Sequence, residues 1–262
     1  MHALIVVAHH DPHSLSQSIA AQVAQGLADN ANTFEVADLW AEGFDPRFGA
    51  ADFSVHHRQA PVPADVVAEQ ARIDRANALV LVYPVFWWSM PALLKGWIDR
   101  VFANGWAFDF TADAPLLKKL QHLQVHLIGV GGADRGTYER HGYGPAMKTQ
   151  IDHGIFDYCG AQVMTSELLL ESETQDPQVH LELARQLRPS LPSTPLADRA
   201  QRPHAPTRPN HPPHPAGNQS SDKSINRKTN FHPITKPSPS HPVKKKFFIQ
   251  IQWFASMPKC FP

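Results

Sequence analysis

Five short apolar runs recur along the first 188 residues, separated by segments of helical or irregular pattern. The first run, at 3–8, is continuous and rich in β-branched residues, which is typical of a strand buried on both faces of a sheet. The run at 78–83 predicts a second buried strand of this kind, and further strands are predicted at 33–38, 124–130 and 162–170. Parallel strands of this kind need covering helices.

Apolar residues at helical spacing lie between these strands. Ile19, Val23 and Leu27 share one face of a predicted helix that Ser14 can cap and that runs to residue 28. Further helices are predicted at 65–76, 91–103, 146–158 and 177–187, whereas prolines and glycines predict irregular structure at 40–62. This alternation predicts an α/β fold: a flavodoxin-like three-layer sandwich with a five-stranded parallel sheet of order 2-1-3-4-5.

Composition divides the chain at Arg188. Residues 1–188 carry 13 Lys and Arg against 22 Asp and Glu, and residues 189–262 carry 11 against 2. The formal net charge of zero is therefore the sum of an acidic N-terminal part and a basic C-terminal part. Fifteen of the 24 prolines follow Arg188, and large apolar side chains are scarce as far as residue 242. Such a segment buries too little surface to offset the entropy cost of ordering. We therefore predict one folded domain at 1–188 and a basic, Pro-rich disordered tail at 189–262, to which no role is assigned.

Cysteine usage and the N-terminus bear on location. The two cysteines, Cys159 and Cys260, are too few for a disulfide framework and are typical of a reducing compartment. The N-terminal apolar run is too short for a signal peptide or a transmembrane helix, and no basic segment precedes it. We expect a cytoplasmic protein with no transmembrane segment and no nucleic-acid partner.

Ligands of an open parallel sheet bind beyond the carboxyl ends of its strands. Three loops are predicted there, and the first, at 9–16, offers the Ser14 and Ser16 hydroxyls and backbone N–H groups at a helix start, which suit a phosphate. His9 can add a donor, while helix capping is an equally good explanation of a single hydroxyl. The loop has no lysine and no Walker glycines, which disfavours a nucleoside triphosphate. Three histidines and Asp11 crowd into five positions, so we expect no metal site.

The second loop, at 84–91, contains three consecutive aromatic residues, Phe86, Trp87 and Trp88. Three such neighbours on a loop cannot all be core residues. An isoalloxazine ring needs flat apolar walls and nearby backbone N–H groups, and bulky rings also exclude water from a hydride-transfer site. The alternative interpretation is a dimer-interface patch, and the two are compatible.

The third loop, at 129–144, is rich in glycine, which lets the backbone approach a ring closely. Tyr138 and His141 follow within it. A phenol and an imidazole there can donate hydrogen bonds to negative charge that develops on a reduced flavin or on a quinone carbonyl. Tyr138 alone is also explained as an exposed loop tyrosine.

These motifs resemble the NAD(P)H:quinone oxidoreductase family, including bacterial quinone reductases and the ancillary flavoproteins of potassium-efflux systems. The resemblance covers residues 1–187 and is most specific at 83–102, with Gly105, Trp106, Ala107 and Phe108 behind it. It implies that the flavin phosphate end is held by His9, Ser14, Leu15 and Ser16. It also implies a ring site lined by Pro84, Val85, Phe86, Trp87, Trp88, Gly129, Val130, Gly131 and Gly132.

The chain departs from the family pattern at a few positions. Tyr138 and His141 resemble the family's Tyr/His pair, at a spacing different from that of the animal enzymes. Ser16 stands where Asn is common. Gly129 and Val130 replace the usual Thr-Thr pair before the two glycines.

The resemblance implies a homodimeric, flavin-dependent enzyme that passes a hydride from NAD(P)H to quinones by a ping-pong mechanism. The absence of the animal enzymes' C-terminal extension favours FMN over FAD, and nothing distinguishes NADH from NADPH. Two alternatives are a flavin-binding regulatory subunit of a potassium-efflux transporter and a flavodoxin-type one-electron carrier. The aromatic walls resemble the hydride-transfer family more than the small carriers.

Overall fold

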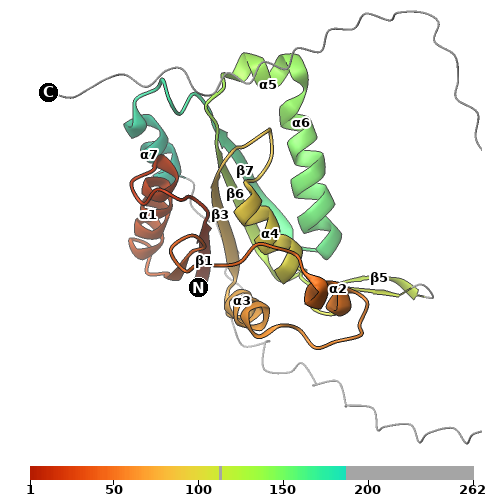
Figure 1. Ribbon diagram of the computed structural model, residues 1–262. Helices are drawn as coiled ribbons and strands as arrows, with labels where there is room; N and C mark the ends of the chain where they lie inside the picture. The colour runs from red at the N-terminus through yellow and green to blue at the C-terminus, as the bar shows by residue number, and fades with distance from the viewer. Residues whose placement is uncertain (112–113, 187–262) are drawn as a thin grey trace, which may run out of the picture. The chain divides into compact units, whose positions relative to one another are not determined.

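The structure, a computed structural model, describes residues 1–111 and 114–186 (Figure 1). Its main sheet has five parallel strands in the order β2-β1-β3-β6-β7, which confirms the predicted flavodoxin-like topology. The strands are β1 (His2–Val7), β2 (Thr33–Asp38), β3 (Ala78–Pro84), β6 (Gln124–Val130) and β7 (Gln162–Leu169). The predicted tail at 189–262 lies outside the described residues.

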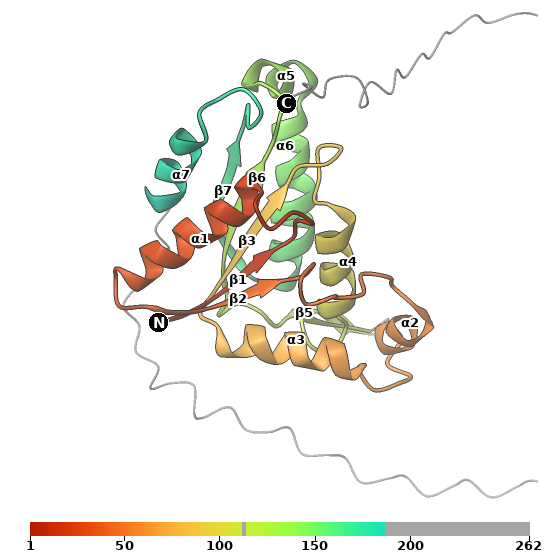
Figure 2. The ribbon, with the colours of Figure 1, turned by 60° about the vertical axis from the view of Figure 1, so that its left-hand side comes forward.

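Helices cover both faces of this sheet (Figures 1 and 2). One face carries α1 (Leu15–Ala28) and α7 (Pro177–Gln186), and the other carries α3 (Ala64–Arg75), α4 (Ala92–Val101) and α6 (Tyr143–Met147), which continues as the π-helix η1 (Lys148–Asp157). Two apolar clusters result: Ile5 packs in the cluster with α1, and Leu4 in the cluster with α4. Burial on both faces explains why β1 is apolar at every position after His2.

The sequence missed three elements. The region expected to be irregular contains α2 (Ala50–His56), and residues 108–118 form an antiparallel hairpin of β4 (Phe108–Thr111) and β5 (Ala114–Lys118). The third is α5 (Arg135–His141), inside the expected glycine-rich loop. A buried ion pair helps to hold α2, because Arg100 Nε donates to Asp52 Oδ1 at 3.0 Å. α2 has only 7 residues, too few to show an apolar periodicity that could predict it.

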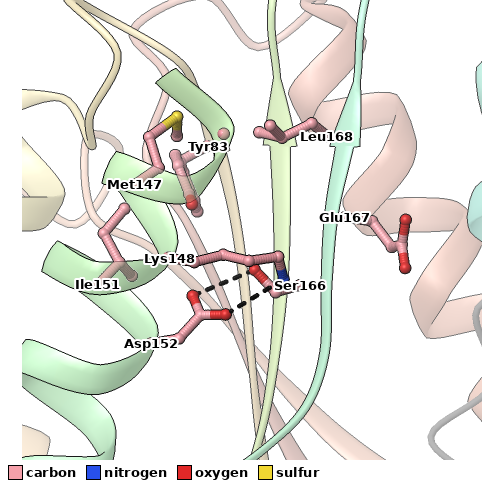
Figure 3. A pocket seen from close by; sticks show the side chains of 9 residues that line it. Tyr83, Met147, Lys148, Ile151, Asp152, Ser166, Glu167 and Leu168 are labelled. Atoms are coloured by element: carbon pink, nitrogen blue, oxygen red, sulfur yellow. Dashed lines mark hydrogen bonds and ion pairs between the residues drawn. The ribbon is translucent and has the colours of Figure 1, made fainter. Parts of the chain in front are cut away.

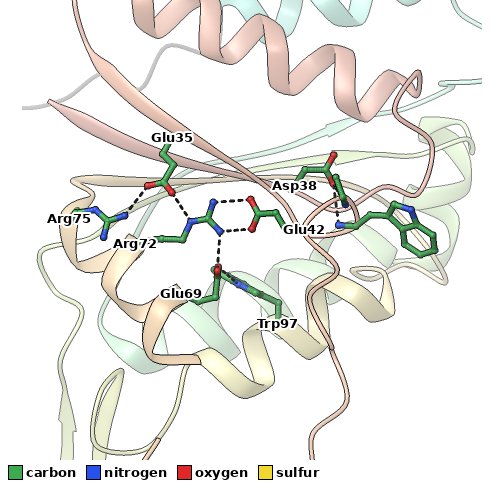
Figure 4. A network of polar contacts seen from close by, with 9 residues as sticks. Glu35, Asp38, Glu42, Glu69, Arg72, Arg75 and Trp97 are labelled. Atoms are coloured by element: carbon green, nitrogen blue, oxygen red, sulfur yellow. Dashed lines mark hydrogen bonds and ion pairs between the residues drawn. The ribbon is translucent and has the colours of Figure 1, made fainter. Parts of the chain in front are cut away.

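A second polar network joins α3 to β2 and to the turn that follows β2 (Figure 4). The Arg72 guanidinium donates to Glu35 at 2.8 Å, to Glu42 at 2.6 Å and to Glu69 at 2.9 Å. Glu69 also accepts a hydrogen bond of 2.9 Å from the indole of the fully buried Trp97. Burial works against ionisation of Glu35, but hydrogen bonds from Arg72 and Arg75 lower the pKa of its carboxyl. The Glu35 carboxylate therefore stays ionised because the two arginines donate hydrogen bonds to it.

His126 of β6 gives the fold a defined response to acid. Its ring is buried, Nδ1 lies 2.9 Å from Thr165 Oγ1, and burial lowers the pKa to about 4 from a usual 6.5. The unfolded chain therefore binds the proton first as the pH falls, so stability is lost between pH 6.5 and pH 4. One pKa unit corresponds to about 1.4 kcal/mol, so this histidine should remove about 3 kcal/mol by pH 4.

The test compares urea unfolding of the wild type and His126→Asn from pH 7.5 to pH 4. We expect the free energy of unfolding to fall less steeply with acid in the variant, because the amide does not titrate. Parallel pH profiles in the two proteins would show that His126 contributes nothing to acid sensitivity.

Among the described residues, no helix combines the length and the apolar character needed to cross a lipid bilayer.

Candidate active site

The three loops singled out from the sequence follow β1, β3 and β6, which are neighbours in the sheet and share a direction. They therefore meet at one edge. Backbone hydrogen bonds link them there: Ala8 N–H donates to Val82 O at 3.3 Å, and Val85 N–H donates to Val130 O at 2.8 Å. A fourth loop, after β7, joins the same edge, since Gly131 N–H donates to Leu169 O at 2.9 Å. The sequence predicts this loop between a strand and a helix but does not single it out as part of the site.

The first loop ends in a capped helix. Ser14 is the N-cap of α1, and its Oγ accepts the Gln17 N–H at 3.3 Å, which confirms the capping interpretation. Ser16 is only 2% exposed and Leu15 packs against the apolar cluster of α1, so neither side chain points into open solvent. The start of a 14-residue helix still presents N–H groups that lack an intrahelical acceptor. The anion-binding capacity of this loop therefore rests mainly on backbone groups and on Ser14.

His9 lies beside this helix start. Its Nδ1 accepts the Asp11 N–H at 3.0 Å, and its ring stacks on His10 with centroids 4.8 Å apart. Burial, followed by the neighbouring His10, lowers the pKa of His9. The ring is thus neutral near pH 7, with its proton on Nε2, where it can donate to an anion. Within residues 1–111 and 114–186, no group of three or more His, Cys, Asp or Glu side chains is placed to hold a metal ion.

The aromatic loop forms a two-residue hairpin. Phe86 N–H donates to Ser89 O at 3.1 Å and Ser89 N–H returns a bond of 3.0 Å to Phe86 O. The two central residues, Trp87 and Trp88, have φ of 50° and 59°, the left-handed region that such turns usually fill with Asn and Gly. A bulky residue there costs about 1–2 kcal/mol. Strain of this kind clusters at functional sites, and packing of Trp87 does not explain it, because that side chain is 81% exposed.

Trp88 belongs to an aromatic cluster. Its ring stacks on Tyr143, with centroids 3.8 Å apart and planes 10° apart, and meets Tyr138 edge-on at 5.3 Å. The His141 ring in turn stacks on Tyr143, with their centroids 5.2 Å apart. The cluster gathers both predicted hydrogen-bond donors around the aromatic loop. The sequence did not single out Tyr143. Its only signal there is that an aromatic residue follows Gly142 directly. In the structure Gly142 has a φ of 68°.

Tyr138 lies on the short helix α5, not on an exposed loop. Asp134 caps this helix, since its Oδ1 accepts the Thr137 N–H at 2.6 Å, and the Tyr138 side chain is turned inward and only 5% exposed. The expectation of an exposed loop tyrosine was therefore wrong. Burial raises the pKa of Tyr138, so the phenol keeps its proton at neutral pH and can donate it to a hydrogen bond. His141 is exposed at the end of α5.

The glycines of the third loop make room for protein side chains. A Cβ on Gly131 would lie 2.8 Å from Tyr138 Oη, and a Cβ on Gly129 would lie 3.1 Å from Val85 Cγ2. At Gly132 the nearest atom would be Glu173 Oε1, at 3.3 Å. Pro84 and Val130 are buried between these positions. A side chain at position 131 would thus collide with the Tyr138 hydroxyl in its observed position. The sequence did not suggest this packing role of Gly131.

A small cavity of about 50 Å³ lies between η1 and the sheet, lined by residues of α6, η1, β3 and β7 (Figure 3). Its polar lining comes from Tyr83, Lys148, Asp152 and Ser166. The Asp152 carboxylate accepts a bond of 3.1 Å from Ser166 Oγ and lies 3.4 Å from Lys148 Nζ. Burial, and then the charge of Asp152, raise the pKa of Tyr83. None of the rings stacked around Trp88 lines this cavity.

Comparisons with known proteins place the chain in a family. A model of the family described as "Flavodoxin-like fold" matches residues 1–188. The ribosyldihydronicotinamide dehydrogenase [quinone] of Pongo abelii is 30% identical over 192 residues, which cover 65% of this chain and 81% of that protein. An uncharacterized NAD(P)H oxidoreductase of Haemophilus influenzae is 27% identical, with coverage of 71% and 93%.

Among solved structures, the NAD(P)H:quinone oxidoreductase of Methanothermobacter marburgensis superimposes with a TM-score of 0.65 at 27% identity, covering 71% of this chain and 96% of that one. This likeness agrees with the sheet order and with the resemblance that the loops suggested. The chain belongs to the flavodoxin-like fold family, among relatives named as NAD(P)H and quinone oxidoreductases.

Proposed function

We propose that the chain is a flavin-dependent NAD(P)H dehydrogenase (quinone). The observation that carries this proposal is the strained turn at Trp87 and Trp88. It presents aromatic rings at the same sheet edge as the start of α1, which suits a phosphate. A flavin bound there supplies two-step, ping-pong hydride transfer from NAD(P)H to a quinone. The names of the relatives support the same reaction.

The residues divide the binding work. The start of α1, with Ser14 and the neutral His9, is proposed to hold the phosphate end, because backbone N–H groups and the helix dipole favour an anion. Phe86, Trp87 and Trp88 are proposed to wall the ring and to exclude water. We propose FMN as the flavin, because the start of α1 suits the single phosphate of FMN.

Tyr138 and His141 are proposed as donors to negative charge that develops during the transfer. Both lie in the ring cluster of Trp88 and Tyr143, and the phenol of Tyr138 stays protonated because burial raises its pKa. Donors held ready in a site of low polarity stabilise developing charge far more than donors in water. These two residues should therefore act on rate more than on cofactor binding.

We also propose a homodimer in the cytoplasm. The hairpin of β4 and β5 carries Phe110 and Leu117, which are 51% and 57% exposed. Exposed apolar side chains on a projecting hairpin suit contact with a second copy.

Sedimentation of the wild type and of the double variant Phe110→Ser with Leu117→Ser tests this proposal. The wild type should sediment as a dimer and the variant as a monomer. Equal sedimentation of the two would exclude this hairpin from the interface.

Loss of either donor should slow hydride transfer. We expect Tyr138→Phe to slow reduction of the flavin by up to about 10²-fold, the scale for one preorganised donor, and His141→Gln to slow it by about tenfold because that side chain is exposed. The Tyr138 effect should be constant from about pH 5.5 to about pH 8.5, since the raised pKa keeps the phenol protonated throughout this range.

Anaerobic stopped-flow mixing with NADH or NADPH measures these rates directly. Flavin content should be the same in all three proteins. If both variants reduce the flavin as fast as the wild type at every pH, neither side chain takes part in the transfer.

A further inference from the structure

The aromatic loop is held from outside by one helix. Its turn is left-handed at both Trp87 and Trp88, and the hydrogen bonds between Phe86 and Ser89 close only the turn itself. A turn that ordinary side chains avoid persists only when surrounding contacts impose it. The source of these contacts identifies the residues that shape the proposed flavin site.

Two contacts reach the loop from the helix formed by α6 and η1. The Tyr143 ring lies flat against Trp88 at 3.8 Å, and Ser89 Oγ donates a hydrogen bond of 2.8 Å to Gln150 Oε1. Tyr143 opens α6 and Gln150 lies in η1, and the two side chains contact neighbouring residues of the loop, Trp88 and Ser89. One contact holds the second tryptophan and the other holds the residue that closes the turn.

Tyr143 also contacts the proposed donors. Its ring stacks on His141 at 5.2 Å and meets Tyr138 edge-on at 6.2 Å. Gly142, with a φ of 68°, lets the chain turn between α5 and α6, so that Tyr143 follows the donors closely in the chain. Trp88 contacts Tyr138 itself, whereas His141 joins the cluster through the Tyr143 ring. The Tyr143 side chain therefore contacts Trp88 and both proposed donors.

We propose that Tyr143 and Gln150 are positioning residues that hold the aromatic loop in the shape that receives the flavin ring. The inference rests on the proposed function. Tyr143 acts through its ring, since the observed contacts are stacked and edge-on, whereas Gln150 acts through its amide oxygen. Neither residue needs to touch the flavin.

The experiment titrates FMN into the full-length chain stripped of flavin and follows flavin fluorescence. Tyr143→Ala should raise the FMN Kd at least tenfold, Tyr143→Phe should restore it to within about twofold, and Gln150→Ala should raise it about threefold to fivefold. Tyr158→Ala is the matched control: Tyr158 lies directly after η1 and packs edge-on against Phe108, away from the aromatic loop. It should leave the Kd unchanged.

Near-UV circular dichroism and thermal unfolding of the flavin-free proteins separate positioning from general stability. Tyr143→Ala should lose the signal of the Trp–Tyr stack while its Tm falls no more than that of Tyr158→Ala. Wild-type affinity for FMN in Tyr143→Ala, or an equal loss of affinity in Tyr158→Ala, would overturn the positioning role. If the wild type binds neither FMN nor FAD, the proposed function fails first, and this inference fails with it.

Discussion

Replacing Trp87 and Trp88 together by alanine is expected to release the flavin and leave the chain folded. The two residues form a turn outside the sheet, and Trp87 is 81% exposed, so its side chain contributes little to the core. Each aromatic contact with a ring ligand is worth roughly 0.5–1.5 kcal/mol beyond the area that it buries. Loss of both should raise the Kd for FMN roughly a hundredfold, which fluorescence titration of the flavin-free chain measures.

The control for this double variant is Phe53→Ala. Phe53 is an aromatic residue of α2 that is 57% exposed and lies outside the three loops. It should retain wild-type affinity, and far-UV circular dichroism should show both proteins folded. A double variant that stays yellow at micromolar concentration would refute the aromatic loop as the flavin site.

Replacing Arg72 by methionine is expected to cause the largest loss of stability of any single change considered. The guanidinium is 14% exposed and serves three carboxylates, of which Glu69 is 9% exposed. Its removal takes away the guanidinium that pairs with the nearly buried Glu69 carboxylate, whereas Glu35 keeps its ion pair with Arg75. Breaking a buried pair by removing one partner costs about 3–5 kcal/mol. Glu69 also accepts the Trp97 indole bond, so the disturbance reaches the core. Urea unfolding at pH 7 measures the change.

Arg75→Met provides the matched comparison on the same helix. Its side chain is 57% exposed and makes one ion pair, with Glu35 at 3.1 Å. Exposed pairs contribute about 1 kcal/mol or less. Equal losses in the two variants would contradict a special role for the buried network around Arg72.

The central strands of the sheet could be predicted because they are apolar enough to be recognised alone. From Ala3 to Val7, β1 is buried on both faces and has no polar position that breaks its pattern. The three loops could be located for a related reason, since parallel strands bring their carboxyl ends together whatever the loop sequences are. Ser14 as the cap of α1 followed from local chemistry, which needs only a few neighbouring residues.

The remaining features depend on contacts between distant residues. Nothing local predicts a left-handed turn at Trp87 and Trp88, because residue preferences there favour Asn and Gly. Tyr138 is buried because Gly131, on another element, leaves space for its hydroxyl. α2 carries Asp52, whose partner Arg100 lies 48 residues along the chain. Such pairings are invisible to periodicity, and they decide which side chains of the site face inward.

The most direct test of the central claim is the visible spectrum of the purified full-length chain during one catalytic cycle without oxygen. We expect absorbance bands of a bound flavin, bleaching on addition of NADH or NADPH, and full return of the bands when a quinone is added afterwards. Acid release and chromatography should then identify the flavin as FMN. A colourless chain that fails to take up added FMN or FAD, or a bound flavin that NADH and NADPH both leave oxidised, would contradict the account.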